Sequence, residues 1–409
     1  MFSERTNWRL AQNRFTQGVE EVRAAGATLL DLTASNPTRV GLAYDSAGIL
    51  LALGSARALD YDPQAKGLRE AREAVAEYYR AEHGIRVDAE RIVLTTSTSE
   101  GYSFVFRLLC NAGDELLVPK PSYPLFEFLA DLQDVKLVPY PLLYDHGWQM
   151  DFPSLEKAVT ERTRGVVVVH PNNPTGSYVH AEEIGLLNTF CQSRGLALIA
   201  DEVFLDYQLG EISGGKAVEF RSTGQPEAAV PTGRMRASFA GNQAVLTFTL
   251  SGLSKISALP QMKVAWVVTS GPAEQVEAAM ERLEVIADTY LSMNAPVQWA
   301  VPALLEQRRS IQKQLLSRVG KNLAELDRQL AGQEACRRLT LEGGWYAVLR
   351  VPVTRSDEEL AIALVRKKGV IVHPGHFYDF PRDGYLVLSL ITAEKEFREG
   401  IARLVEFMN

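Results

Sequence analysis

Residues 166–176, VVVVHPNNPTG, join four consecutive valines to a loop of turn-forming residues. The run 166–169 is apolar and β-branched, as expected for a strand that is buried on both faces of a parallel sheet. Two prolines and a glycine restrict the backbone of the loop, so the side chain of Asn173 has a defined direction at the strand's end. An ordinary Asx turn would use the same residues. The segment therefore predicts a parallel sheet with a rigid polar loop at one edge.

Similar apolar runs, bounded by Gly, Pro, Asn or Asp, occur along the first two thirds of the chain. Between several of them lie stretches with helical spacing, such as 100–110 and 181–194. This alternation predicts the α/β class, with a large, doubly wound and mostly parallel sheet. The other predicted strands of this sheet are residues 91–95, 115–118, 196–200, 245–248 and 264–268.

The pattern changes after about residue 273 to long helical stretches followed by strand-like runs, which predicts a second, smaller α+β domain. We expect residues 46–285 to form the large domain, residues 286–409 the small domain, and residues 1–45 to join the small domain. The helices of the second pattern are expected at 273–287 and 297–330, with strands at 345–350 and 385–390.

Two further segments are a predicted connecting helix and a stretch rich in turns. A single long helix at 297–330 would connect the two domains. Residues 210–243 are poor in apolar residues and rich in turns, which fits either a mobile surface loop or a lid near a site. The sequence leaves these two alternatives open.

The composition is typical of an ordinary globular protein. The 409 residues are 46% hydrophobic and 23% charged, and 43 Lys and Arg against 50 Asp and Glu give a net charge of −7. This balance argues against a nucleic-acid-binding surface. The three cysteines lack CxxC spacing, the histidines do not cluster as metal ligands, and nothing predicts a signal peptide or a membrane-spanning segment. We therefore expect a cytoplasmic protein without nucleic-acid or membrane partners.

A turn rich in hydroxyl groups, TSTSE, occupies residues 96–100 between a predicted strand and a predicted helix. Backbone N–H groups at such a helix start, with the hydroxyls of Ser97, Thr98 and Ser99, suit a bound phosphate. A plain N-cap that pairs Ser97 with Glu100 explains the same residues. The turn alone does not decide between these two interpretations.

Aromatic or ionisable side chains follow three further strands. Tyr123 lies in a proline-rich turn, Asp201 ends an apolar strand, and Lys255 follows the strand at 245–248. A carboxylate that emerges from a buried strand needs a cation or a donor as its partner. Burial would lower the pKa of the lysine and make its amine a nucleophile, whereas a solvated surface lysine is the ordinary alternative. Because parallel strands end at one edge of a sheet, we expect these side chains to meet there.

These clusters, taken in order, resemble the fold type I pyridoxal phosphate enzymes, and specifically the class I/II aminotransferases. The chain has no GxGxxG, P-loop or HExxH motif, which argues against dinucleotide, nucleotide and zinc-hydrolase sites. The resemblance spans nearly the whole chain and implies pyridoxal 5′-phosphate as the cofactor. The matching segments are YDPQAKGLREAREAVAEYY (61–79), SYP (122–124), NNPTG (172–176), ADEVF (200–204) and SGLSK (251–255).

The resemblance implies a role for residues of each motif. Lys255 would bind the cofactor covalently and move the substrate's proton, Asp201 would face the pyridine nitrogen, and Asn173 would hydrogen-bond the ring hydroxyl. Tyr123 would stack on the ring. Tyr61 would reach the cofactor phosphate of a partner subunit, which implies a homodimer with shared active sites. The other implied cofactor-binding residues are Ser97, Thr98 and Ser99 at the phosphate, Ser254, Phe204 and Lys263.

Three positions depart from the usual pattern of this family. Phe204 stands where a tyrosine is usual, and Lys263 where many relatives have an arginine against the phosphate. Val387 stands where an arginine usually binds the substrate's α-carboxylate. Either another group replaces this arginine or the substrate has no carboxylate there. The candidate substrate-binding residues from the sequence are Asn36, Arg39, His376 and Arg382.

The function implied by the resemblance is transfer of an amino group between an amino donor and a 2-oxo acid, with ping-pong kinetics. Two alternatives remain at this point. The same cofactor supports other reactions, such as β-elimination by a C–S lyase, decarboxylation or racemisation. The third hypothesis is a protein that binds the cofactor without catalysis, although Lys255, Asp201 and Asn173 are all present.

Overall fold

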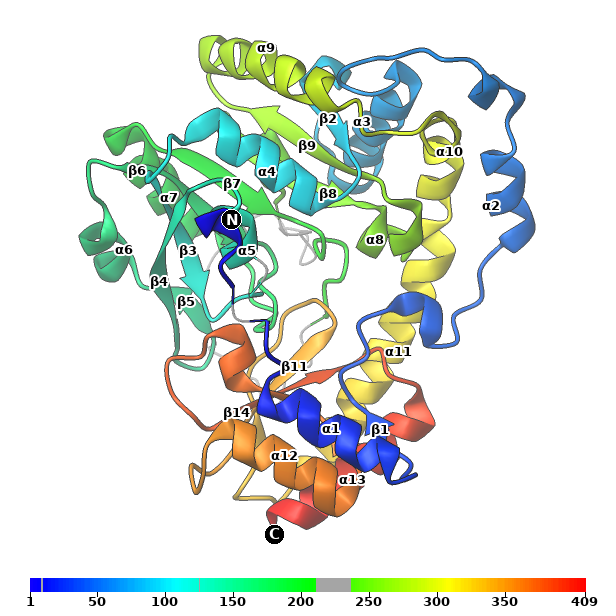
Figure 1. Cartoon of the computed structure of the whole chain (residues 1–409), viewed down its shortest axis with the longest axis vertical. Coiled ribbons are helices and arrows are strands. Elements are labelled where there is room, and N and C mark those ends of the chain that lie inside the picture. The colour runs from blue at the N-terminus through cyan, green and yellow to red at the C-terminus, as the bar shows by residue number, and fades with distance from the viewer. Residues whose placement is uncertain (9, 125, 211–236) are drawn as a thin grey trace, which may run out of the picture.

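The structure is a computed structural model, and it describes residues 1–8, 10–124, 126–210 and 237–409. Most of the segment 210–243, for which a loop or a lid was predicted, lies outside these residues. Figure 1 shows a large sheet with its helices in the upper part of the molecule and a smaller sheet with its helices below. None of the helices in the described part of the chain has both the length and the apolar character that a bilayer-spanning helix needs.

The large sheet has eight strands in the order β2-β9-β8-β7-β6-β3-β4-β5. Strands β9 and β5 run antiparallel to their neighbours, and the other strands share one direction. The predicted mostly parallel sheet is therefore confirmed. The strands are β2 (Ile92–Thr95), β3 (Glu115–Lys120), β4 (Lys136–Tyr144), β5 (Trp148–Met150), β6 (Thr163–Val169), β7 (Ala197–Asp201), β8 (Thr247–Gly252) and β9 (Ala265–Ser270).

Helices cover both faces of this sheet because its central strands are apolar on both faces. Val167 and Val169 of β6 pack into one hydrophobic cluster, and Val166 and Val168 pack into another. The first face carries α4 (Thr98–Leu109), α5 (Phe126–Asp131) and α9 (Ala273–Tyr290). The opposite face carries α2 (Ser46–Leu53), α3 (Arg69–His83), α6 (Phe152–Ala158), α7 (Ala181–Arg194) and α10 (Ala295–Glu306).

The parallel strands of the sheet end together, as expected from the sequence. Val169 at the end of β6 pairs with Asp201 at the end of β7, and Asp201 pairs with Leu250 of β8. The loops that follow these three strands therefore start at one level of the sheet. The short helix α8 (Leu253–Ile256) follows β8 directly.

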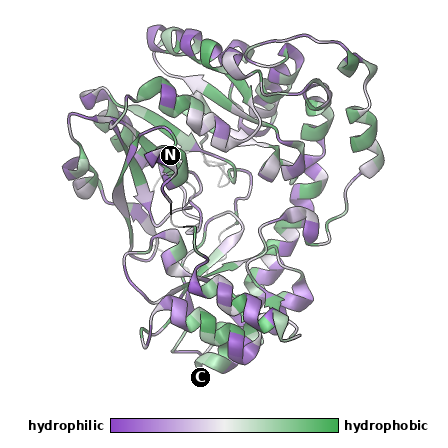
Figure 2. Cartoon of the chain, viewed as in Figure 1, coloured by the Kyte–Doolittle hydropathy of each residue, from purple (hydrophilic) through white to green (hydrophobic). Residues whose placement is uncertain are grey.

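The second unit contains a four-stranded antiparallel sheet in the order β10-β11-β14-β13. Its core includes Phe15, Val19 and Leu32 from the N-terminal part of the chain. Helix α1 packs on α12, and purple and green residues alternate along both helices in Figure 2, as in amphipathic helices. The elements are α1 (Arg14–Ala24), β1 (Leu30–Asp31), α11 (Arg308–Leu330), β10 (Arg337–Arg338), β11 (Tyr346–Arg350), α12 (Asp357–Lys368), β12 (Val370–Ile371), β13 (His373–Pro374), β14 (Tyr385–Ser389) and α13 (Glu394–Met408).

A strand from the N-terminal part of the chain pairs with one from the C-terminal part in this second unit. Strand β1 pairs in parallel with β12, through Leu30 opposite Val370 and Asp31 opposite Ile371. The short helical turns of the chain are η1 (Glu4–Thr6), η2 (Pro37–Arg39), η3 (Ala56–Leu59), η4 (Ala89–Arg91), η5 (Phe239–Gly241), η6 (Pro260–Met262) and η7 (Gly375–Tyr378).

The prediction of a single helix at 297–330 is wrong, because the chain forms two helices that meet at Gln307. Helix α10 buries Val297, Ala300 and Leu304 in the same cluster as α3, whereas α11 packs in the core of the second unit. Each helix therefore packs its apolar face against the core of a different unit. The domain boundaries at residues 45 and 286 stay predictions.

Candidate active site

A cavity of about 380 Å³ lies beyond the carboxyl ends of the parallel strands, between the large sheet and the second unit. Its volume lies within the range usual for small-molecule sites. Predicted residues from five separate strand ends meet here, which is the arrangement expected for an open parallel sheet. The predicted residues that line the cavity are Thr98, Ser99, Tyr123, Asn173, Asp201, Phe204, Ser254 and Lys255.

Asp201, the last residue of β7, presents its carboxylate to this cavity. The Val203 N–H donates to Oδ1 at 3.1 Å, and the Tyr102 hydroxyl donates to Oδ2 at 3.0 Å. Burial raises the pKa of Asp201 to about 6, although these donors and the charge of Lys255 act in the opposite direction. The acid therefore has the donors that a buried carboxylate requires, and it is anionic at neutral pH.

Lys255 lies in α8 on the wall next to Asp201. Burial lowers the pKa of its amine to about 8, and the charge of Asp201 opposes this shift. The Nζ atom lies 4.9 Å from the ring centroid of Trp345 and 5.5 Å from that of Phe204. The Tyr207 hydroxyl donates to the Lys255 carbonyl at 2.6 Å, which fixes the backbone. A lysine with a pKa of about 8 is roughly one tenth neutral at pH 7, far more than an unperturbed lysine, and the neutral amine is the form that acts as a nucleophile or base.

The turn before Lys255 is held against β9 by a close backbone approach. A Cβ atom on Gly252 would lie 2.8 Å from the Val264 carbonyl oxygen, so no larger residue fits. The Leu253 N–H donates to the same carbonyl at 3.0 Å. Strand β9 therefore positions the helix that carries the lysine, which explains the glycine of the SGLSK motif.

The NNPTG loop separates the two roles that the sequence left open for its asparagines. The Asn172 side chain accepts from the Thr175 hydroxyl at 2.9 Å, so this residue forms the Asx turn. The Oδ1 atom of Asn173 is buried and has no hydrogen-bond partner in the described part of the chain. An orphaned buried acceptor on a cavity wall points to a ligand that carries a donor.

The start of α4 contains the predicted N-cap, and its first turn also lines the cavity. Ser97 is the N-cap, and its hydroxyl accepts from the Glu100 N–H at 3.2 Å. Thr98 and Ser99 in the first turn line the cavity. The positive end of a helix dipole therefore faces the cavity next to two hydroxyl groups. The Glu100 carboxylate accepts from the Thr96 N–H at 2.7 Å.

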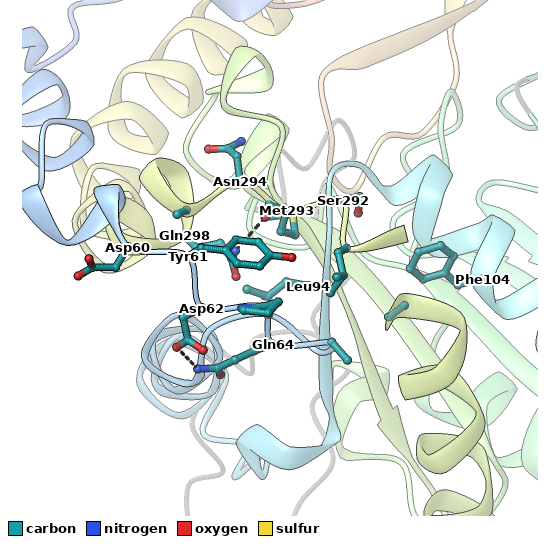
Figure 3. Close-up of a pocket in the computed structure, with 16 residues that line it drawn as sticks. Asp60, Tyr61, Asp62, Gln64, Leu94, Phe104, Ser292, Met293, Asn294 and Gln298 are labelled. Carbon is teal, nitrogen blue, oxygen red and sulfur yellow. Dashed lines mark hydrogen bonds between the residues drawn. The ribbon is translucent and has the colours of Figure 1, made fainter. Parts of the chain in front are cut away.

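Tyr61 lies outside this cavity. It is 84% exposed and lines a separate hollow of about 190 Å³, which Figure 3 shows with Asp62, Gln64 and Asn294 around it. The Gln64 side chain donates to the Asp62 carboxylate at 2.7 Å. Within this one chain, the tyrosine therefore lines a different hollow from Lys255.

Five other predicted residues are exposed and are not among those that line the cavity. Lys263 ends a short helical turn with a backbone φ of 54°. The Asn36 side chain accepts from the Thr38 N–H at 3.0 Å and so caps a local turn. Their predicted roles stay predictions. The five residues are Lys263, Asn36, Arg39, His376 and Arg382.

Known proteins resemble this chain over nearly its full length. The family model for aminotransferase class I and II matches residues 32–404. The chain belongs to this family. It is 27% identical to the alanine aminotransferase of Mycobacterium bovis, over 96% of this chain and 88% of that one. It is 25% identical to the glutamate-pyruvate aminotransferase AlaA of Haemophilus influenzae, over 94% and 91% of the two chains.

Solved structures agree with this assignment at the level of the fold. The alanine aminotransferase from Pyrococcus furiosus has a TM-score of 0.86 to this chain at 20% identity, covering 100% of this chain and 99% of that one. An aminotransferase from Escherichia coli has a TM-score of 0.84 at 22% identity, covering 100% and 98%. The chain is thus a pyridoxal phosphate-dependent aminotransferase of fold type I, which confirms the family, cofactor and fold expected from the sequence.

The cavity of this aminotransferase fits its cofactor chemically. The donor set comprises an amine for the aldehyde, a carboxylate for the ring nitrogen and a helix start for the phosphate. The unpaired Oδ1 of Asn173 is the acceptor that a ring hydroxyl requires. The described residues that line the cavity therefore supply the chemical groups that pyridoxal phosphate needs.

Five polar residues of the cavity wall were not predicted from the sequence. Tyr102 follows the phosphate turn by one helical turn, so helical spacing places it near Thr98 and could have identified it. The other four come from the N-terminal segment and the second unit, where no motif marks them. The missed residues are Tyr102, Ser35, Tyr346, His373 and Tyr378.

A buried polar network lies behind the lysine helix. Asp206 accepts from the Tyr78 hydroxyl at 2.8 Å and lies 3.1 Å from His83 Nε2. The Gln312 side chain bridges Asp206 and the Ile256 carbonyl at 2.7 Å and 2.9 Å. This network ties α8 to α3 and α11 and limits the movement of Lys255.

Proposed function

We propose that this aminotransferase moves an amino group from an α-amino acid to a 2-oxo acid, with Lys255 as the base and Asp201 as the partner of the cofactor's ring nitrogen. The observation that carries the proposal is that these two side chains face one cavity at the carboxyl edge of the sheet. Asn173, Tyr123, Phe204 and Ser254 complete the proposed cofactor site, and Ser97, Thr98 and Ser99 are the proposed phosphate site.

The chemistry divides between the cofactor and the chain. When bound, pyridoxal phosphate supplies an aldehyde for the amino group and a ring that withdraws electrons from the donor's Cα. Lys255 Nζ accepts the proton that leaves Cα, because burial keeps part of the amine neutral near pH 7. Asp201 stays anionic and stabilises positive charge beside it.

The substrates are proposed from relatives, whose names are alanine aminotransferase and glutamate-pyruvate aminotransferase. Alanine and glutamate are therefore the first donors to test, with pyruvate and 2-oxoglutarate as acceptors. Val387 stands where the family usually carries an arginine, so the carboxylate of these substrates needs another partner in this chain.

The direct test is spectroscopic. We expect the purified protein to bind pyridoxal phosphate and to show an absorbance change when alanine or glutamate is added without an acceptor. Addition of a 2-oxo acid should then restore the first spectrum, because the two half-reactions are separate. Stopped-flow absorbance measures both steps.

The acceptor dependence distinguishes this function from the lyase alternative. Release of ammonia and a 2-oxo acid in the absence of any acceptor would contradict the proposal and favour elimination chemistry. A protein that binds the cofactor but shows no spectral change with any amino acid would favour the non-catalytic alternative.

We further propose a homodimer in which Tyr61 contributes to the partner's phosphate site. Helix α2 lies at the right edge of the molecule in Figure 1, and its ribbon is largely green in Figure 2. Leu50, Leu51 and Leu59 are 68%, 81% and 89% exposed. Adjacent exposed apolar residues of this size are typical of an interface.

The dimer predicts a specific effect of charge on this surface. Leu51→Glu should convert the protein to a monomer and weaken cofactor binding, because Tyr61 could no longer reach the partner. Sedimentation velocity and a cofactor titration measure the two effects. Leu186→Glu, on exposed α7, is the matched control and should leave both unchanged. A Leu51→Glu variant that sediments like the unchanged protein would contradict this interface.

The proposed compartment is the cytoplasm. Cys110, Cys191 and Cys336 are free thiols, and burial raises the pKa of Cys191 to about 12. Thiols in this state suit a reducing compartment. The proposed partners are small amino and 2-oxo acids, a second copy of the chain and no nucleic acid or membrane.

A further inference from the structure

The wall of the cavity opposite the large sheet comes from the antiparallel sheet of the second unit. Tyr346 of β11 and His373 of β13 both line the cavity. In an antiparallel sheet, residues directly opposite each other on neighbouring strands carry their side chains on the same face. The strand register therefore shows which positions of β14 share the cavity side.

Val387 is at the centre of this face. It pairs with Val348 of β11 on one side and with His373 of β13 on the other. Since His373 faces the cavity, the side chain at position 387 lies on the cavity side of the sheet, although it is short and buried. A valine offers no donor to a carboxylate. Its cross-strand neighbour His373 does.

Few cations are available to a substrate in this cavity. Among the described residues that line it, the only side chains that can carry a positive charge are Lys255 and His373. Lys255 is already assigned to the cofactor and the proton. His373 is therefore the remaining group on the wall that can neutralise a carboxylate.

The imidazole of His373 is held in a fixed position by its neighbours. Its Nδ1 lies 3.0 Å from the Tyr378 hydroxyl, and its ring centroid lies 5.8 Å from that of Phe377. The Tyr378 carbonyl in turn accepts from the Ser122 N–H of the large unit at 3.0 Å. A side chain fixed between the two units can position a substrate with accuracy.

Burial leaves the imidazole of His373 neutral before substrate arrives. Burial lowers its pKa to about 4, and Asp31 of β1 opposes this shift. Lys255 and Tyr346 face the same cavity, and β14 contributes the uncharged Val387. The carboxylate of Asp357, in α12, accepts from the backbone N–H groups of Gly384 and Tyr385. A substrate carboxylate would favour the protonated imidazole, so binding would take up a proton.

We propose that His373, positioned by Tyr378, is the specificity-determining residue that binds the substrate carboxylate in this chain, in place of an arginine on β14. The proposal rests on the proposed function, because it assumes an amino acid or 2-oxo acid in the cavity. It assigns the carboxylate to a site whose charge appears only on binding. An arginine would carry that charge permanently.

The experiment compares two non-reactive ligands of the same size on the cofactor-loaded enzyme. Propanoate carries a carboxylate and propanamide does not, and competition against the amino donor gives both dissociation constants. His373→Gln should weaken propanoate binding about 10-fold or more, as expected for a lost charge-assisted hydrogen bond, and should change propanamide binding less than about twofold. His146→Gln, on the exposed turn between β4 and β5, is the control and should change neither.

Two further measurements separate recognition from a structural role. Calorimetry in buffers of different ionisation enthalpy should show proton uptake when propanoate binds near pH 7, and His373→Gln should abolish it. Val387→Arg, on the same face of the sheet, should restore propanoate binding in the His373→Gln background. The cofactor absorbance should be the same in all these variants.

Three results would overturn the proposal. The first is propanoate binding that His373→Gln leaves unchanged. The second is an equal loss for propanoate and propanamide, which would indicate a structural role. The third is an unsubstituted enzyme that binds propanamide as tightly as propanoate, which would indicate substrates without a carboxylate. Failure of the unsubstituted protein to bind pyridoxal phosphate would instead contradict the proposed function itself.

Discussion

Replacing Lys255 with alanine is expected to lower kcat by at least about 10³-fold, because the variant lacks the base that moves the Cα proton. The cavity contains no other amine among the described residues that line it. The measurement is a single-turnover assay with saturating cofactor and donor, monitored by absorbance. The variant should still bind the cofactor noncovalently, since the acid and the helix start are unchanged.

Two controls make this result specific. Lys157→Ala, on the exposed end of α6, removes the same side chain elsewhere and should leave kcat unchanged. A small added amine such as methylamine should partly restore the rate of Lys255→Ala, because it can supply the missing base. A Lys255→Ala variant that retains near-normal turnover would eliminate the proposed mechanism.

Replacing Asp201 with asparagine should lower kcat by roughly 10²- to 10³-fold, the usual cost of removing one preorganised electrostatic group. The carboxylate is the anion that the proposed site places beside the ring nitrogen, and asparagine cannot supply its charge. Tyr102→Phe, which removes the 3.0 Å hydrogen bond to Asp201, should give a smaller loss in the same direction. Asp288→Asn, exposed on α9, is the matched control. An Asp201→Asn variant with unchanged kcat would contradict the assigned role.

The same substitution has a predictable effect on stability. The pKa of Asp201 is raised from 3.8 to about 6 in the folded chain, so the folded state binds more protons than the unfolded state between these values. The free energy of unfolding therefore falls as the pH rises from about 4 to 6, by on the order of 2 to 3 kcal/mol for this group. Asp201→Asn should remove that pH dependence from the cofactor-free protein, which urea unfolding at pH 4.5 and 7 measures.

Lys255 contributes to stability in the complementary pH range. Its pKa is lowered from 10.5 to about 8, so the unfolded state binds more protons between these values and stability rises with pH there. Both charged groups thus destabilise the empty site near pH 7. A cofactor that pairs with both charged groups offsets the free-energy cost of burying them, and so stabilises the folded protein.

The large sheet and its motifs were predictable because strand ends of a parallel sheet share one edge. Asp201, Asn173 and Lys255 each follow an apolar run that is recognisable from β-branched residues alone. Once the runs are strands of one sheet, the three side chains must lie near each other. The glycine at position 252 adds a steric reason that only the packing against β9 reveals.

The cavity wall that the second unit contributes was not predictable from the sequence, for a physical reason. His373 and Val387 become neighbours through pairing between strands that are short and separated by η7. Sequence periodicity predicts that a strand exists, whereas register depends on the turn and on packing. Reasoning from residue type therefore favoured the exposed residues His376 and Arg382 over the half-buried His373.

The split between α10 and α11 has a similar origin. Both helices have continuous helical spacing, so the sequence predicts one element across 297–330. The apolar faces of the two halves point to different cores, and this difference appears only when both units are assembled.

The pairing of β1 with β12 sets the order of events during synthesis on the ribosome. Leu30 emerges early, but its partner Val370 is made 340 residues later. At about 5 to 20 residues per second, this delay is roughly 20 to 70 seconds. The strands of the large sheet, which end at Ser270, can assemble during that interval, while the first segment of the chain must wait without its partner. Chaperones that shield exposed apolar segments on nascent chains would therefore be expected to contact residues 14–32 first.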